Sequence, residues 1–262
     1  IMRTMQPPKI AVAGLAEATE PWRMERKLAA ALTRLGCEVV PTNAAELTLA
    51  MRKTADLADL NGSRLCVWHA ETIDKRKAAL KARSEELEEL ASSADLFLHS
   101  LKKSGVFLGG AEPTFHPLGL ERDIDVLHYG TLTPRRKKVL KQLANAGVEI
   151  THVEEYDHEK LNVWLNRAKV VLNIHAYSAT PIVETRLAEC LSAGAYVLSE
   201  PLPEWSDFCG YVENGTELAT MCKSALDLPN WRTRCARSGR DWVWNHQRLD
   251  QNVERALERC GL

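Results

Sequence analysis

The chain has 262 residues, of which 34 are Lys or Arg and 35 are Asp or Glu, so its formal net charge is −1. Apolar residues make up 45% and charged residues 26%, an ordinary globular composition that excludes disordered, collagen-like and disulfide-scaffold classes. The length fits one large domain or two small ones, since domains commonly hold about 100–200 residues.

Targeting signals and cysteine motifs are absent from the sequence. No apolar run approaches the ~20 residues that span a bilayer, and the first residues have no secretory signal pattern. The seven cysteines are scattered without a C-x-x-C pair, which argues against a disulfide framework and a zinc site. We therefore expect a cytoplasmic protein with reduced thiols. Neither half has the basic excess that is typical of nucleic-acid-binding surfaces.

The first half alternates between strand and helix patterns, which predicts a parallel sheet with right-handed crossovers. Strands are expected at residues 9–14, 37–41, 63–71 and 95–100, and helices at residues 21–36, 45–60 and 77–94. The clearest helix has Pro21 near its start, Gly36 at its end, and Leu28, Ala31 and Leu32 at helical spacing.

A second α/β pattern follows a Pro-containing linker at residues 115–119. Strands are expected at residues 123–130, 148–154, 169–177 and 195–200, and helices at residues 133–147, 158–168, 185–194 and 216–228, before a mostly helical tail. The first of these helices has Thr133 as N-cap, Pro134 at its first position and Gly147 as its stop.

The predicted fold is α/β, with two Rossmann-like doubly wound domains facing a cleft and an abbreviated N-terminal domain. The domains are expected at residues 1–118 and 119–240, with a C-terminal helix at 241–262 crossing back to the first. Ligands of such folds bind where strand carboxyl ends and helix N-termini converge.

Three segments in the second half, DIDVLHYGTLTPRRKKVL, KVVLNIHAY and ETRLAECLSAGAYVLSE, resemble the donor-binding domain of glycosyltransferases with the GT-B fold. The resemblance is greatest to the small bacterial and phage-type branch that includes spore-coat glycosyltransferase-like proteins, and it covers roughly residues 123–200. The first half fits by architecture alone, because Gly14 is not followed by a G-x-G-x-x-G pattern.

The segment YGTLTPRR places a glycine turn, hydroxyl groups and two arginines at a strand-to-helix junction. Helix N-termini and arginine forks suit a diphosphate, and the resemblance implies that Arg136, or its neighbour Arg135, holds the donor diphosphate beside Gly130 and Thr131. The alternative is that the basic run is a solvated helix face.

The segment ETRLAE contributes Glu184, Arg186 and Glu189. The resemblance implies that Glu189, before CLSAG, accepts hydrogen bonds from the nucleotide ribose, a task that suits a carboxylate. Pro181 stands where relatives have a partner glutamate, and Glu184 is the substitute that we expect. This departure leaves a retaining or an inverting outcome open. A surface Glu–Arg pair is the alternative.

Polar residues also end the predicted central strand of the second half. Asn173, His175 and Tyr177 are expected to line the donor pocket, because strand carboxyl ends meet at the crevice of an open sheet, and Glu200 ends the next strand. The alternative for His175 is a structural role.

In the first half, His69 and Glu71 close a predicted strand and are the candidate general bases, since deprotonating a hydroxyl requires such a group. Glu17 is a weaker candidate, and strand-end capping is the alternative. The D-x-D at Asp123 and Asp125 opens a strand, so we interpret it as structural and expect no obligatory metal or other cofactor.

The expected function is transfer of a sugar from a nucleotide-diphosphate sugar, UDP-sugar favoured, to a hydroxyl acceptor on a glycan, a protein or a modified DNA base. One alternative is a glycosyltransferase acting on a hydroxymethylated base in DNA. A non-catalytic nucleotide-binding module and a sugar-nucleotide epimerase are the others. The oligomeric state is left open.

Overall fold

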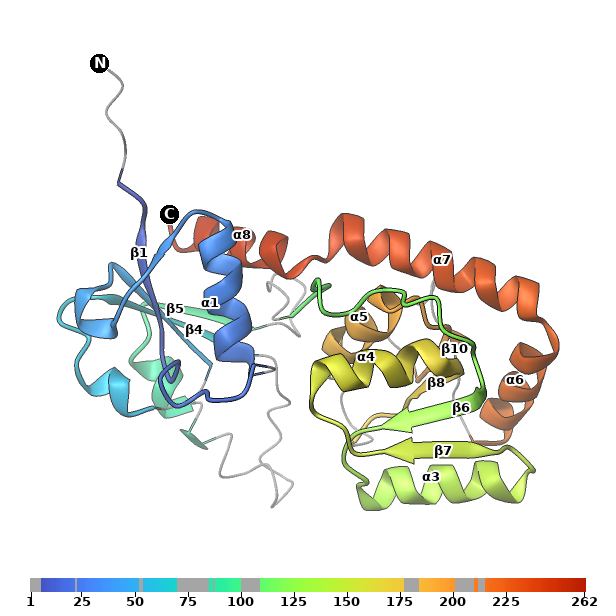
Figure 1. Cartoon of the computed structure of the whole chain (residues 1–262). Helices are drawn as coiled ribbons and strands as arrows, with labels where there is room; N and C mark the ends of the chain where they lie inside the picture. The colour runs from blue at the N-terminus through green and yellow to red at the C-terminus, as the bar shows by residue number, and fades with distance from the viewer. Residues whose placement is uncertain are drawn as a thin grey trace. The chain divides into compact units, whose positions relative to one another are not determined.

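The structure is a computed structural model that describes residues 6–21, 23–51, 54–69, 85–86, 88–99, 109–176, 184–200, 210–211 and 215–262. The chain divides into two units, which Figure 1 shows with their helices and strands labelled. The first unit consists of Ile1–Gly109 and Leu249–Leu262, and the second of Gly110–Arg248. No helix in the described part is long and apolar enough to cross a membrane.

The first unit contains a parallel five-stranded sheet with the order β2-β1-β3-β4-β5. Its strands are β1 (Lys9–Val12), β2 (Glu38–Val39), β3 (Leu47–Ala50), β4 (Arg64–His69) and β5 (Leu96–His99). The helical elements that belong to it are α1 (Met24–Arg34), the 3-10 turns η1 (Thr42–Ala44) and η2 (Ala55–Ala58), and α8 (Leu249–Arg259).

The expected helix at residues 45–60 is wrong, because this segment contains β3, the central strand of the first sheet. All four residues of β3 are buried, including Thr48, whose hydroxyl is 2.8 Å from that of Ser63. A strand buried on both faces has no polar alternation, and a short apolar run of this kind does not distinguish a strand from a helix.

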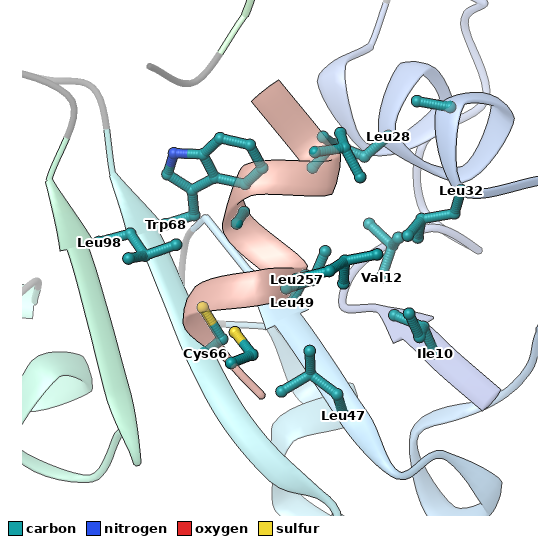
Figure 2. Close-up of a cluster of buried hydrophobic side chains, with 14 of the residues drawn as sticks. Ile10, Val12, Leu28, Leu32, Leu47, Leu49, Cys66, Trp68, Leu98 and Leu257 are labelled. Atoms are coloured by element: carbon teal, nitrogen blue, oxygen red, sulfur yellow. The ribbon is translucent and has the colours of Figure 1, made fainter. Parts of the chain in front are cut away.

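The core of the first unit combines residues from both ends of the chain. Leu28 and Leu32 of α1 and Trp68 of β4 are fully buried in it, together with Val253 of α8. In Figure 2 the labelled side chains of α1 and of the strands gather around the helix that contains Leu257, which is α8. The C-terminal segment is thus part of the hydrophobic core of the first unit.

The second unit contains a parallel five-stranded sheet with the order β10-β9-β8-β6-β7. Its strands are β6 (Ile124–Tyr129), β7 (Ile150–Val153), β8 (Ala168–Asn173), β9 (Val197–Ser199) and β10 (Gly210–Tyr211). Its helices are α3 (Pro134–Asn145), α4 (His158–Arg167), α5 (Glu184–Ser192), α6 (Gly215–Asp227) and α7 (Pro229–His246).

Two parallel sheets, each within an α/β unit, confirm the predicted fold class. In the second unit, buried Val126 of β6 and Val170 and Leu172 of β8 form the core together with residues of α6. Because the strands are parallel, their carboxyl ends share one edge of the sheet, where the loops into α3 and α5 begin.

Candidate functional site

The described residues that we expected to bind a donor all belong to the second unit. Gly130, Thr131, Asn173 and His175 end or follow β6 and β8, Arg135 and Arg136 lie in the first turn of α3, Arg186 lies in the first turn of α5, and Glu189 lies in the middle of α5. Parallel strands therefore bring positions that are far apart in the chain to one sheet edge, which we call the carboxyl edge.

The turn between β6 and α3 follows from local sequence. Gly130 has a φ of +87°, a conformation that disfavours other residues, and its N–H donates to the carbonyl of Val153 at 2.9 Å. Thr133 is the N-cap of α3, and its hydroxyl accepts a hydrogen bond from the backbone N–H of Arg136 at 3.3 Å. The conformation of Gly130 and the N-cap hydrogen bond of Thr133 therefore fix the turn that leads into α3.

Arg136 is buried and bonded to the backbone. Its Nε donates to the carbonyl of Ile174 at 2.8 Å, and its Nη1 donates to the carbonyl of Thr131 at 2.9 Å. Burial and the nearby charge of Arg186 lower the pKa of Arg136 to about 10, so it remains charged at neutral pH. The side chain ties the loop after β6 to the end of β8.

Arg135 forms an ion pair at the same edge. Its Nη1 donates to the carbonyl of His175 and to Oε2 of Glu200, both at 2.8 Å, and its Nη2 pairs with Oε1 of Glu200. Glu200 also accepts from the backbone N–H of His175. The hydrogen bond that Arg135 donates to Glu200 is the main cause that raises the pKa of Arg135.

Arg186, in the first turn of α5, lies against the loop after β6. Its guanidinium carbon is 4.7 Å from the ring centroid of Tyr129, a cation–π contact, and its Nη2 is 3.0 Å from where a Cβ on Gly130 would lie. Its Nη1 is buried and has no hydrogen-bond partner in the described ranges. A glycine at position 130 leaves room for this arginine.

Two further buried atoms at the carboxyl edge have no hydrogen-bond partner within the described residues, namely Oδ1 of Asn173 and Nε2 of His175. Burial lowers the pKa of His175, and the charges of Arg135, Arg136 and Arg186 add to this, against the opposing effect of Glu200. The imidazole is therefore neutral at pH 7. Buried polar groups without partners are uncommon, so these atoms indicate a place where a polar ligand can bind.

Glu189 is buried and engaged with neighbouring side chains. The hydroxyl of Tyr129 donates to its Oε2 at 3.0 Å, and Nε2 of His158 lies 3.8 Å from its Oε1. Burial raises the pKa of Tyr129, so its phenol stays protonated and serves as the donor. Ligand atoms of Glu112, His158 and Glu189 lie within 4.8 Å of one another, a set that could hold a divalent metal ion.

A histidine pair lies between β6 and β7, in which His128 is buried and His152 is half-buried. Nδ1 of His128 and Nδ1 of His152 are 3.0 Å apart, and Nδ1 of His152 is 3.1 Å from the carbonyl of His128. The bond to the carbonyl requires a proton on Nδ1 of His152, so Nδ1 of His128 is the acceptor between the rings. Burial, then the charges of Arg186 and Arg136, lower the pKa of His128 to about 3.

The remaining candidates are only partly described. His69 is the last residue of β4 in the first unit, and Glu184 is the first residue of α5. The side chains of both, and the whole of Glu71 and Tyr177, lie outside what the structure describes. Asp123 and Asp125 pair with Arg167 at 2.6 Å and Lys169 at 2.5 Å, at the amino ends of β6 and β8.

Sequence reasoning missed Tyr129, His158 and Glu112. Tyr129 ends its strand directly before Gly130, a position that could have indicated a polar group at the edge. No sequence signal pointed to His158 or Glu112, because only the fold brings α4 and the segment around residue 112 close to α5.

Comparisons with known proteins place this arrangement in context. Residues 112–258 match the family described as glycosyl transferase-like, and no curated protein sequence matches the chain. Sucrose-phosphate synthase from Thermosynechococcus elongatus is similar in structure, with a TM-score of 0.63 and 14% identity over 96% of this chain and 98% of that one.

Two DNA-related enzymes are also similar in structure. An α-glucosyltransferase, solved with UDP-glucose and DNA containing an abasic site, has a TM-score of 0.65 and 9% identity over 98% of this chain and 99% of that one. The DNA-modifying enzyme β-glucosyltransferase has a TM-score of 0.61 and 11% identity over 97% of this chain and 100% of that one. At these identities the likeness shows a shared fold, the GT-B fold.

Proposed function

The chain belongs to the glycosyl transferase-like family and is a glycosyltransferase, and we propose that it takes the sugar from a nucleotide-diphosphate sugar, preferably a UDP-sugar, and transfers it to a hydroxyl acceptor. The observation that supports this donor most directly is a set of buried atoms at the carboxyl edge of the second sheet, on Asn173, His175 and Arg186, that have no hydrogen-bond partner among the described residues.

The charge at this edge suits a diphosphate. The positive charges of Arg135, Arg136 and Arg186 all lower the pKa of His175, so the three guanidinium groups lie near it. Among these arginines, the described hydrogen bonds join Glu200 to Arg135 alone. Arg186 supplies an N–H that no described residue accepts, near the start of α5, where helix N–H groups favour an anion. We therefore assign the diphosphate contact to Arg186 and a positioning role to Arg136, which holds the loop through the carbonyl of Thr131.

The nucleotide ribose is assigned to Glu189. A carboxylate has acceptor capacity on both oxygens, and Tyr129 occupies a site on Oε2. In this assignment the ribose hydroxyls donate to Oε1, which faces His158. The buried position of Glu189 strengthens such bonds, because a hydrogen bond to a charged group gains from a low local dielectric.

The transfer itself requires an acceptor oxygen to attack the anomeric carbon while the bond to the diphosphate breaks. The arginines of the carboxyl edge would stabilise the negative charge on the leaving diphosphate. His69 or Glu71 of the first unit is proposed as the base that removes the acceptor proton. Neither residue is needed for donor binding in this scheme.

A direct test is to incubate the full chain with UDP-glucose, UDP-N-acetylglucosamine and GDP-mannose and to measure release of the free nucleotide. We expect slow hydrolysis of at least one UDP-sugar, together with binding of UDP by calorimetry. Absence of binding for every nucleotide diphosphate would refute the proposed donor.

A hydroxymethylated base in DNA is the second candidate acceptor. The observation that favours it is the likeness over nearly the whole chain to two enzymes whose descriptions name DNA. A gel shift with hydroxymethylated duplex at low salt tests it, because phosphate contacts must weaken steeply as salt rises. Transfer of labelled glucose to the duplex would establish this acceptor, and equal transfer to free glycan acceptors would argue against it.

A further inference from the structure

A second charged site lies at the opposite edge of the second sheet. A hollow of about 320 Å³ is lined by Arg122, just before β6, by Lys169 at the start of β8, and by residues of α7. The strands β6 and β8 have six residues each, so this amino edge is separated from the carboxyl edge by about 20 Å. The hollow is therefore distinct from the proposed donor site.

Basic side chains dominate this hollow, and none of the described residues that line it is an aspartate or a glutamate. The five basic residues are Arg122, Lys169, Arg232, Arg237 and Arg240. Asp125 pairs with Lys169 at 2.5 Å and Asp241 lies 4.0 Å from Arg240, whereas the other three form no ion pair within the described ranges. The hollow consequently has an excess of positive charge.

Two of these arginines are held in place by backbone carbonyls. Arg122 donates from Nη1 to the carbonyl of Ala168 and from Nη2 to that of Gly194, the latter at 2.7 Å. Arg232 donates from Nη1 to the carbonyls of Ala225 at 2.5 Å and Leu226 at 3.3 Å. Carbonyl partners orient a guanidinium without neutralising it, so its charge remains available to an anion.

The packing of like charges is unfavourable without a ligand. Burial lowers the pKa of Arg122, and the charge of Arg232 lowers it further. On the solvent side, Arg237 is exposed, and Nε of Arg240 is buried with no hydrogen-bond partner among the described residues. An anion in the hollow would relieve the repulsion and supply the missing acceptor.

We propose that this basic hollow binds a small ligand with a phosphate group. Arginine forks match phosphate oxygens in geometry and charge, and the volume lies in the range of small-molecule pockets. A nucleic-acid backbone fits less well, because the overall charge is −1 and the basic residues surround a concavity. Tyr196 and Pro117 add an apolar wall for the rest of the ligand.

The test uses calorimetry at low salt with pyrophosphate as the probe. The double variant Arg237→Ala, Arg240→Ala removes two of the cations from α7. Arg237 is exposed and Arg240 is half-buried, and alanine favours a helix, so the fold should survive. Arg234→Ala is the matched control, an exposed arginine of the same helix that does not line the hollow. Pyrophosphate can also bind at the carboxyl edge, so Arg186→Ala is measured in parallel.

We expect the double variant to weaken one class of pyrophosphate sites about tenfold or more, with UDP affinity and the control variant unchanged. That class of sites should persist in Arg186→Ala. The proposal is overturned if Arg186→Ala abolishes all pyrophosphate binding or if the double variant binds as the parent does. It is equally overturned if a DNA duplex, and not pyrophosphate, loses affinity in the double variant.

Discussion

The hydroxyl of Tyr129, the last residue of β6, donates a hydrogen bond of 3.0 Å to Oε2 of Glu189 in α5. Both side chains are buried, so the carboxylate is oriented before any ligand arrives. The relationship makes the role of Glu189 testable, because the two partners can be changed separately.

Glu189→Gln should lower UDP affinity about tenfold, because the amide offers one acceptor oxygen where the carboxylate offers two. Tyr129→Phe is the matched control, since it removes the donor and leaves both carboxylate oxygens in place. This control should lower the melting temperature and leave UDP affinity within about twofold. Calorimetry and thermal denaturation measure the two effects. If Glu189→Gln melts lower but binds UDP as the parent does, the carboxylate is structural.

Arg186→Ala should weaken UDP binding about tenfold or more and leave uridine binding unchanged. In our assignment the diphosphate is the part of the nucleotide that the lost guanidinium contacts. Arg167→Ala removes a half-buried arginine paired with Asp123 at the amino edge, and it should alter neither affinity. Titrations with UDP and uridine compare the two variants. Equal losses of affinity for UDP and uridine would show that Arg186 does not contact the diphosphate.

Gly130→Ala should destabilise the second unit and also weaken UDP binding. The φ of +87° costs an alanine about 1 kcal/mol or more, and the new Cβ would press on Nη2 of Arg186 at 3.0 Å. Gly147→Ala has a similar φ of +78° but meets no atom within 4 Å. The two variants should lose similar stability in urea, and only the first should lose UDP affinity. If Gly130→Ala and Gly147→Ala bind UDP with equal affinity, Gly130 is not part of the donor site.

His128 should make the protein less stable as the pH falls from neutrality. Its pKa of about 3 lies below the ~6.5 of an unfolded chain, so between these values the unfolded state binds a proton that the native state does not. The free energy of unfolding then falls by about 1.4 kcal/mol for each pH unit between these two pKa values.

Urea denaturation at pH 7, 6 and 5 measures this dependence. His128→Leu should flatten the decline, because leucine does not titrate and Nδ1 of His152 keeps the carbonyl of residue 128 as acceptor. The exposed His116 offers a control, and His116→Gln should leave the slope unchanged. If His128→Leu loses stability with falling pH as steeply as the parent does, His128 is not the cause of this pH dependence.

Much of the second unit could be predicted from local sequence signals. Thr133, Pro134 and Gly147 mark the ends of α3 as expected, because caps and glycine stops act within one turn of a helix. The strand β3 could not be predicted, because its burial on both faces depends on neighbours that are distant in the chain.

The roles of neighbouring site residues were decided by tertiary structure. The sequence favours Arg136 as the diphosphate ligand, with Arg135 as its neighbour, yet Arg135 pairs with Glu200 and Arg136 is buried on two backbone carbonyls. Successive residues of a helix point about 100° apart, so adjacent side chains meet different surroundings.

The sequence by itself therefore determined the α/β alternation, the resemblance of residues 123–200 and the set of polar groups at strand ends. Only the folded chain decided which of those groups are engaged with protein and which have unused hydrogen-bonding atoms, as Arg186 does. The physical reason is that hydrogen-bond partners, burial and charge repulsion act between residues that are close in space, whatever their separation along the chain.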